Sequence, residues 1–236
     1  MATNTQPPST ALLLSGGVDS AVLLDQLLVR GWQVVPIYVR TGCSWQSCEI
    51  NAVERFLASA AHPRLSELVT LDMPLADLYG GHWSISGDNV PDDSTPDEAV
   101  YLPGRNPLLM IKPAMWCHLH GIEHLAIATL AANPFRDATP QFFARFEEML
   151  HEAVGGRVQI SRPFESFTKA RLLELGRHLP LELTFSCLAP VEGLHCGRCN
   201  KCAERQKGFR DVGRSDDTTY AVPSEPHAAH DGAAHR

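Results

Sequence analysis

Six consecutive residues, Ser15-Gly16-Gly17-Val18-Asp19-Ser20, carry the strongest chemical signal in the sequence. Glycines allow a backbone to approach a phosphate closely and to turn its N–H groups toward it. A helix that starts here adds a positive field and free N–H donors. The Ser15 and Ser20 hydroxyls can donate hydrogen bonds, and Asp19 suits a Mg²⁺ ion that bridges to pyrophosphate. The segment therefore predicts ATP and Mg²⁺ as ligands.

Two commoner phosphate loops do not fit this segment. No Gly-Lys-Ser/Thr follows the glycines, so the loop is not of the Walker A type. The Gly-x-Gly-x-x-Gly pattern of dinucleotide folds is missing as well. An ordinary glycine turn between a strand and a helix is the plain alternative, and six matching residues in the right context argue against it.

Four cysteines near the C-terminus form a second chemical motif. Cys187, Cys196, Cys199 and Cys202 are spaced C-x8-C-x2-C-x2-C. Thiolates two residues apart can reach one tetrahedral Zn²⁺ ion, and a fourth thiolate closes such a site. An iron–sulfur cluster and a set of buried free cysteines are the alternatives. Zinc is favoured over both, because nothing in the sequence suggests redox work. His195 is expected to be a neutral neighbour rather than a ligand.

Composition limits the class of protein. The chain has 236 residues, of which 44% are hydrophobic, enough for a real core. No run approaches the ~20 apolar residues of a membrane span, and the first ten residues do not resemble a signal peptide. A net charge of −7 disfavours non-specific nucleic-acid binding. The crowded cysteines suggest metal binding in a reducing cytoplasm, and Cys43, Cys48 and Cys117 are expected to be small apolar residues.

Alternating strands and helices must position the two motifs. The sequence predicts an α/β fold, a parallel sheet with helices on both faces. Strands are expected over 11–14, 33–39, 67–73, 124–130 and 158–163, and helices over 21–30, 48–61, 107–120, 139–154, 168–179 and 201–208. The 79–100 segment, rich in Gly, Pro and acids, is typical of a functional or mobile loop. We expect a nucleotide-binding domain over 1–180, a zinc-binding segment over 181–210 and a disordered tail over 211–236.

The phosphate loop resembles the signature of the PP-loop ATP pyrophosphatases, and further segments narrow the resemblance. The phosphate loop and the cysteine cluster, in this order, are similar to those of the QueC family, 7-cyano-7-deazaguanine synthase. Pro103-Gly104-Arg105-Asn106 resembles the family's segment before a long helix, and Thr168-Lys169-Ala170 resembles its Ser-Lys-Ala helix start. Asp137, followed by Pro140 and Phe142-Phe143, occupies the place of another family motif. The resemblance covers about residues 11–210.

This resemblance implies a Rossmann-like fold of the adenine nucleotide alpha hydrolase kind, a zinc site, and ATP with Mg²⁺. It implies a ligase that adenylates 7-carboxy-7-deazaguanine and, with ammonia, forms the nitrile, releasing AMP and pyrophosphate. Asp19, Lys169 and Arg105 are the expected catalytic residues, the last two neutralising phosphate charge. The alternative is a QueC-like enzyme that joins a deazaguanine or other acid to a different amine.

Two other functions are compatible with a phosphate loop, those of a nucleotide-binding regulator and of a tRNA-thiolating enzyme. The intact Asp19 and Lys169 argue against the first, and the absence of a basic run argues against the second. The sequence leaves the oligomeric state open, with a homodimer as one option.

Two segments depart from the family pattern, 38–46 and 129–137. Both follow predicted strands at their carboxyl ends, where doubly wound sheets bind ligands. Five of their residues are the expected lining of an acceptor pocket: Arg40, Trp45, Asn133, Arg136 and Asp137. Trp45 would supply a stacking face, Arg40 or Arg136 would hold a carboxylate, and Asp137 would accept hydrogen bonds from a ring amine.

Overall fold

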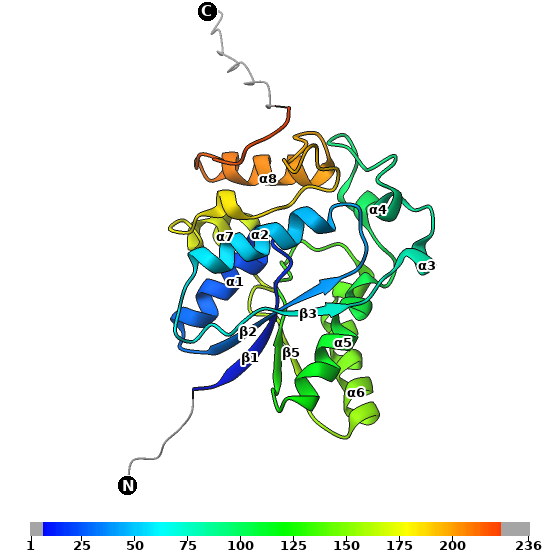
Figure 1. The fold of residues 1–236 in the computed structure, drawn as a ribbon, viewed down its shortest axis with the longest axis vertical. Coiled ribbons are helices and arrows are strands. Elements are labelled where there is room, and N and C mark those ends of the chain that lie inside the picture. Colours follow the sequence, from blue (N-terminus) through cyan, green and yellow to red (C-terminus); the bar gives the residue numbers. More distant parts are fainter. Residues whose placement is uncertain (1–6, 223–236) are drawn as a thin grey trace, which may run out of the picture.

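A computed structural model describes residues 7–222 and shows a five-stranded, wholly parallel sheet in the order β3-β2-β1-β4-β5 (Figure 1). The strands are β1 (Ser9–Leu13), β2 (Gln33–Arg40), β3 (Val69–Asp72), β4 (His124–Ala126) and β5 (Gln159–Ser161). The strand order reverses direction beside β1. The carboxyl end of β1 is therefore the switch point at which such sheets bind ligands.

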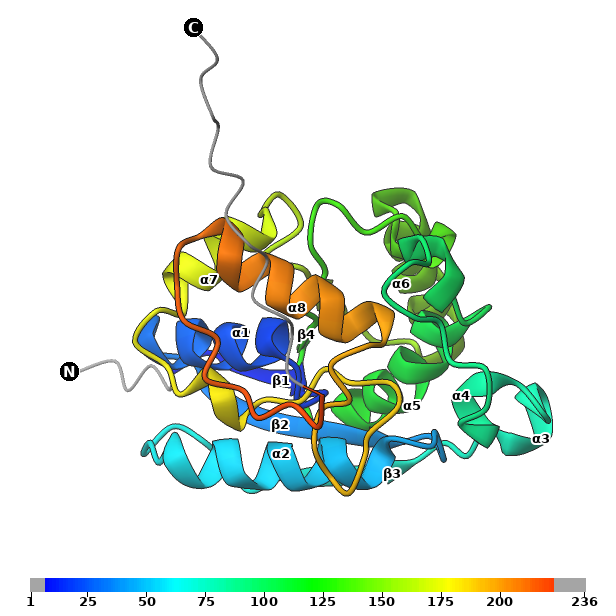
Figure 2. The same cartoon turned by 90° about the horizontal axis from the view of Figure 1, so that it is seen from above.

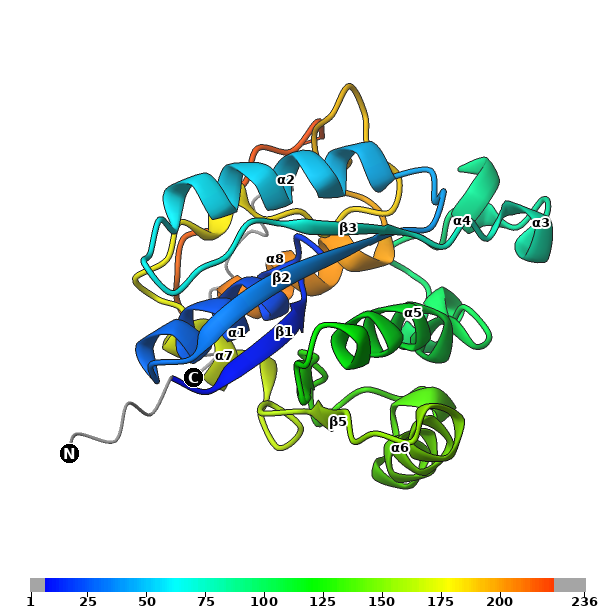
Figure 3. The same cartoon turned by 60° about the horizontal axis from the view of Figure 1, so that its bottom comes forward.

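Alternate residues of the central strands feed two hydrophobic cores, one on each face of the sheet. Leu12 and Leu14 pack with α1 (Val18–Val29), α2 (Gln46–Ser59), α7 (Lys169–Leu175) and α8 (Asn200–Asp211). Ala11 and Ile37 pack with α5 (Arg105–Leu119) and α6 (Pro140–Val154). Figure 3 shows α2 and α5 on opposite sides of the strands. The predicted α/β fold with helices on both faces is thus confirmed.

Hydroxyl caps start two of the helices that follow the strands. Thr139 Oγ1 accepts a hydrogen bond of 3.1 Å from the Phe142 amide, with Pro140 as the first residue of α6. Thr168 Oγ1 accepts one of 3.2 Å from the Arg171 amide at the start of α7. Such caps satisfy backbone donors that have no partner within the helix. Among the residues that the structure describes, no helix has both the length and the apolarity needed to cross a bilayer.

The 79–100 segment, expected as a loop, contains short helical turns and is tied to the rest of the chain. It includes α4 (Trp83–Ser86) and the 3₁₀ turn η1 (Asp97–Val100), and it follows α3 (Ala76–Tyr79). The Asp93 amide donates to the Arg198 carbonyl at 2.9 Å, and the Asn200 amide donates to the Pro91 carbonyl at 3.0 Å. The middle of this segment is therefore held by the cysteine-containing part of the chain.

Residues 211–222 correct the expectation of a tail that is disordered from Asp211 onward. Within them, the Tyr220 hydroxyl donates to Asp216 at 2.6 Å, and Tyr220 pairs with His195 as an isolated bridge. Asp216 also lies 3.6 Å from the guanidinium of Arg205 in α8. Figure 2 shows this stretch running beside α8. The polar composition gave no sign of this order, because hydrogen bonds and one ion pair, not apolar periodicity, hold the stretch. Residues 223–236 lie outside the described part of the chain.

The Arg205→Lys variant is expected to unfold more easily than the wild type. Arg205 is 3% exposed and donates to Thr218 Oγ1 at 2.9 Å, Thr184 Oγ1 at 2.8 Å and the Leu181 carbonyl at 2.7 Å. Lysine keeps the charge but cannot reproduce the planar fork of donors. Urea denaturation at fixed metal content should show a loss of about 2–4 kcal/mol in unfolding free energy.

Arg210→Lys is the matched control, because Arg210 is exposed on the same helix. It should change the unfolding free energy by less than ~0.5 kcal/mol. Equal effects of the two substitutions would contradict the role given to the Arg205 network.

Candidate active site and metal centre

The phosphate loop joins β1 to α1, and its own hydroxyl groups form hydrogen bonds within it. Gly17 is the N-cap of α1, with an extended backbone at φ −78° and ψ 163°. The Ser20 hydroxyl donates to the Gly17 carbonyl at 3.0 Å, and its oxygen lies 3.2 Å from the Ser15 hydroxyl. Within the described residues no side chain caps the helix, so the first backbone N–H groups of α1 remain available for an anion.

Gly16 is the point at which the loop approaches its surroundings most closely. Its φ is +79°, and a Cβ atom there would lie 2.9 Å from the carbonyl oxygen of Glu49 in α2. Its own carbonyl accepts a hydrogen bond of 2.7 Å from the Phe185 amide. The left-handed backbone and the absence of room both require glycine at this position.

Lys169 and Asp19, expected from sequence to act on the nucleotide, meet beside the loop. The Lys169 ammonium lies 2.6 Å from Asp19 Oδ1 and 3.7 Å from Glu204 Oε1, so α1, α7 and α8 each contribute one charge. Burial lowers the pKa of Lys169, but the two carboxylates outweigh burial and leave the pKa raised. Lys169 is therefore a permanent cation at the mouth of the loop. Sequence reasoning missed Glu204.

A second cluster lies on the α2 side of the loop, and two of its members were not expected. The Tyr38 hydroxyl donates to Glu49 Oε2 at 3.0 Å. Burial raises the pKa of Glu49, and the positive charge of Arg105 is the largest opposing effect. The sequence held a signal for Glu49, because it lies four residues before Val53 and seven before Phe56, both buried on the inner face of α2.

Two of the five expected acceptor-pocket residues lie at the carboxyl end of β2, Arg40 as its last residue and Trp45 beyond it, and each has a partner. The Arg40 guanidinium binds both carboxylate oxygens of Asp72, at 2.6 and 2.9 Å. Trp45 is 2% exposed, and its ring stacks on Trp83 of α4 at a centroid distance of 5.8 Å. In this structure, therefore, the Arg40 charge is neutralised and the face of Trp45 is covered.

The other three expected pocket residues follow β4. Asn133 Oδ1 accepts a hydrogen bond of 3.0 Å from the Phe135 amide, while Arg136 is exposed in a short 3₁₀ turn. Asp137 is buried and accepts from the Asn106 amide at 3.0 Å, next to Arg105 at the start of α5. The structure therefore ties Asp137 to Asn106 in the first turn of α5, whereas Asn133 shapes its own turn.

Thr129, which no motif singled out, belongs to the same edge of the sheet. It follows β4, is 8% exposed, and its hydroxyl has no partner among the described residues. A buried unpaired hydroxyl is a group that a ligand can satisfy.

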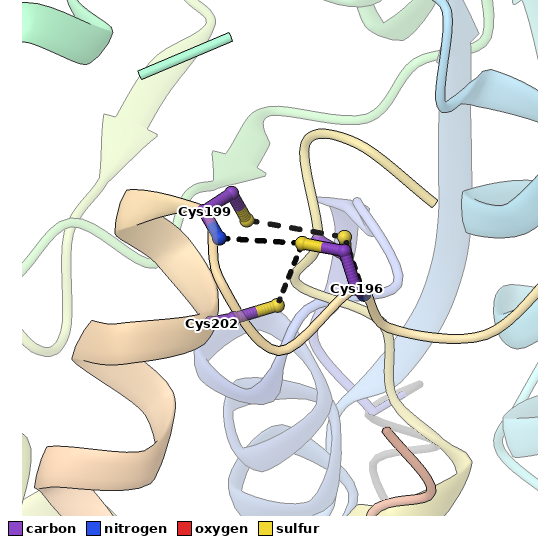
Figure 4. Close-up of side chains that lie close together, drawn as sticks. Cys196, Cys199 and Cys202 are labelled. Atoms are coloured by element: carbon purple, nitrogen blue, oxygen red, sulfur yellow. Dashed lines mark hydrogen bonds between the residues drawn. The ribbon is translucent and has the colours of Figure 1, made fainter. Parts of the chain in front are cut away.

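The four predicted metal-binding cysteines converge. Their sulfur atoms all lie within 4.8 Å of one another, with 3.9 Å between Cys196 and Cys202 and between Cys187 and Cys199. Figure 4 shows three of these side chains, Cys196, Cys199 and Cys202, pointing toward one another. Four thiolates around one Zn²⁺ would be about 3.8 Å apart, given Zn–S near ~2.3 Å. In a four-iron cluster each thiolate binds a different iron. Sulfurs gathered this tightly suit a single ion.

Backbone amides around this cluster point at sulfur. The Cys196 amide donates to Cys187 Sγ at 3.2 Å, and the Leu188 amide donates to Cys199 Sγ at 3.4 Å. Such donors stabilise thiolates and orient metal ligands. All four cysteines are buried, so the site is closed. These residues fit a structural metal ion with no open coordination position.

His195, expected as a neutral neighbour of the metal ligands, lies beside the cysteine cluster with one ring nitrogen already engaged. Its Nε2 accepts a hydrogen bond of 3.0 Å from the Ser186 amide, and its ring packs 4.5 Å from the ring of Phe185. Burial lowers the pKa of His195 to about 4, so the ring is neutral at physiological pH.

A family model and the sequences of known proteins match most of the chain. A family model described as "Queuosine biosynthesis protein QueC" matches residues 9–213. A 7-cyano-7-deazaguanine synthase of Solidesulfovibrio magneticus is 30% identical over 235 residues, covering 92% of this chain and 98% of the relative. One of Syntrophobacter fumaroxidans is 30% identical over 228 residues, covering 89% and 94%.

Solved structures give weaker likenesses. A U34-tRNA thiolase, NcsA from Methanococcus maripaludis with its [4Fe-4S] cluster, aligns with a TM-score of 0.45 and 15% identity over 90% of this chain and 75% of that one. An NMN synthetase from Francisella tularensis aligns with a TM-score of 0.48 and 14% identity over 91% and 81%.

The Gly16→Ala variant is expected to be destabilised and to lose nucleotide affinity. The added methyl group would meet the Glu49 carbonyl at 2.9 Å and Val53 Cγ2 at 3.3 Å. Gly31→Ala is the control, because Gly31 has φ +84° and a Cβ added there would meet nothing within 4 Å. A positive φ alone costs about 1–2 kcal/mol.

Thermal and urea unfolding should therefore show a larger loss for Gly16→Ala than for Gly31→Ala. Titration with a non-hydrolysable ATP analogue should show weaker binding for Gly16→Ala only. Equal losses at the two glycines would mean that the close approach of the loop to α2 does not matter.

Proposed function

The chain belongs to the QueC family, and from that membership we propose that it is an ATP-dependent ligase that converts 7-carboxy-7-deazaguanine and ammonia into 7-cyano-7-deazaguanine. The observation that carries the proposal is the phosphate loop at the switch point of the sheet, in which Asp19 Oδ1 accepts a hydrogen bond of 2.6 Å from the Lys169 ammonium. Relatives named 7-cyano-7-deazaguanine synthase, matched along nearly their whole length, support the choice of substrate.

Two adenylations account for the reaction. The acceptor carboxylate oxygen attacks the α-phosphorus of ATP, and pyrophosphate leaves; ammonia then displaces AMP from the mixed anhydride to give the amide. The amide oxygen attacks a second ATP in the same way. Loss of AMP and a proton from that adduct leaves the nitrile. Each cycle consumes two ATP and releases two AMP and two pyrophosphates.

The residues of the chain can be given parts in this scheme. The N–H groups at the start of α1 and the Ser15 and Ser20 hydroxyls bind the phosphates. Lys169, held by Asp19 and Glu204, faces the charge that moves to the departing pyrophosphate. Asp19 would hold Mg²⁺, which draws charge from the phosphates when bound.

The zinc ion is proposed as a structural part of the enzyme. Four buried thiols with sulfurs 3.9 Å apart in two pairs suit tetrahedral Zn²⁺. A closed site offers no position for substrate, so the ion would support the fold rather than the chemistry.

The nucleotide products test the first half of the proposal. With ATP, ammonia and 7-carboxy-7-deazaguanine, the enzyme should release AMP and pyrophosphate, and mass spectrometry should detect the nitrile and its amide precursor. ADP as the main nucleotide product would refute the PP-loop chemistry. AMP formation with the acid joined to another amine would keep the chemistry and change the acceptor.

Asp19→Asn should reduce turnover by at least about 100-fold, because it removes a negative oxygen that a metal ion needs. Asp25→Asn is the matched control, since Asp25 lies on the same helix near His178, away from the loop. Both variants should keep the circular dichroism spectrum of the wild type. A loss of activity in Asp25→Asn alone would show that the active site lies elsewhere.

One zinc per chain is the expected metal content. Elemental analysis should find it in the wild type, and X-ray absorption should show four sulfur ligands. Cys199→Ser should lose the metal and unfold at lower temperature, because binding free energy of a structural ion is folding free energy. Cys48→Ser should retain the metal, since Cys48 lies in α2 outside the cluster. Iron in place of zinc would overturn the assignment.

A further inference from the structure

We infer that Arg105 binds the carboxylate of the acceptor acid and so distinguishes the acid from its uncharged amide. The inference rests on the proposed function, whose acceptor it describes further. From sequence, Arg105 is grouped with Lys169 as a residue that neutralises phosphate charge. The structure separates the two residues.

The cations near the carboxyl edge of the sheet differ in whether they have partners. Two nitrogens of the Arg40 guanidinium, Nε and Nη2, bind Asp72 at 2.6 and 2.9 Å. Lys169 is bound by Asp19 at 2.6 Å. The Nε of Arg105, by contrast, is buried and has no hydrogen-bond partner among the described residues. A buried donor without a partner is costly, and a bound carboxylate would satisfy it with charge-assisted hydrogen bonds.

The backbone around Arg105 is fixed. Arg105 is the first residue of α5, after Gly104 in the left-handed conformation at φ +73°. Asp137 Oδ2 accepts from the Asn106 amide at 3.0 Å, and Asn106 Nδ2 donates to the Asp137 carbonyl at 2.9 Å. Asp137 thus already serves the start of the helix. An added anion would have to be bound by the guanidinium side chain.

Arg105 begins α5, which packs on the sheet face opposite to the face covered by α1 and by α7, the helix of Lys169. Its charge acts on Tyr38 of β2, Glu49 of α2 and Tyr79 of α3, in each case lowering a pKa that burial raises. The Glu49 backbone in turn touches Gly16. Lys169 belongs to the α1, α7 and α8 side. A carboxylate held at Arg105 therefore lies beside the loop that holds ATP, as attack on the α-phosphorus requires.

The nearby carboxylate of Glu49 does not prevent Arg105 from binding an added anion. One of its carboxylate oxygens, Oε2, already accepts the Tyr38 hydroxyl at 3.0 Å. Burial raises the pKa of Glu49, which disfavours its charged form and leaves the positive charge of Arg105 less opposed.

The two acceptors of the reaction differ in charge, which gives the inference its test. The acid is an anion and the amide is neutral, so only the acid gains from a guanidinium partner. Arg105 would favour entry of the acid, contribute little to the amide, and hold the nitrile weakly. We expect the first adenylation to depend on Arg105 more than the second.

Calorimetric titration of the full-length, metal-loaded protein with a non-hydrolysable ATP analogue present tests this dependence. Arg105→Met should weaken binding of 7-carboxy-7-deazaguanine by about 10- to 100-fold and binding of its amide by less than about threefold. Arg105→Lys should restore part of the acid affinity. The affinity for the ATP analogue alone should not change, and thermal melting should confirm that both variants fold.

Each other outcome has a distinct meaning. Loss of ATP-analogue affinity in Arg105→Met would show that Arg105 binds the phosphates, which would overturn the inference. Equal losses for acid and amide would reduce Arg105 to a structural role, and acid binding lost in Arg40→Met instead would assign the wrong arginine. A wild type that binds the ATP analogue but neither acid nor amide would refute the proposed substrate, and the inference with it.

Discussion

One hydrogen bond, from the Phe185 amide to the Gly16 carbonyl at 2.7 Å, ties the phosphate loop to the cysteine segment. Phe185 lies two residues before Cys187, so whatever fixes that cysteine also fixes the support of the loop. On its other side the loop touches the backbone of Glu49 in α2. Gly16 is thus held between two elements, and its lack of a side chain is what allows both contacts.

Charge is divided across the loop in a way that suits two ligands. Lys169, Asp19 and Glu204 form a compact set on one side, in which the cation is already paired. Arg105 begins α5, which packs on the opposite face of the sheet, and lies among groups whose burial raises their pKa values. In the proposed reaction, Lys169 could leave Asp19 for a phosphate when ATP binds, because Asp19 suits a metal ion as well as a lysine. Arg105, whose buried Nε has no partner among residues 7–222, instead suits one anion in one position, as proposed.

Local sequence patterns predicted the fold and the candidate motifs, whereas contacts between distant elements were not predictable. Ser15–Ser20 and the four cysteines are contiguous or nearly so, and their spacing alone predicted a phosphate loop and a metal cluster. Strand and helix periodicity predicted the sheet, because each face packs its own core. The partners of Arg40 and Trp45 were not predictable, since Asp72 and Trp83 come from other elements. The order of residues 211–222 was missed because an arginine network, not an apolar pattern, holds them.

The cysteine segment also holds the part of the chain that leads to α5, where the acceptor is proposed to bind. The Asn200 side chain, directly after Cys199, donates to the Thr95 carbonyl at 3.0 Å, and the Asp93 amide donates to Arg198 at 2.9 Å. These contacts hold the segment that runs on through η1 to Gly104 and Arg105. The thiol cluster is therefore attached to both walls of the site, to the phosphate loop through Phe185 and to the approach to α5 through Asn200. In the proposed reaction, a closed cluster that touches no substrate could in this way set the distance between nucleotide and acceptor, on which an adenylation depends.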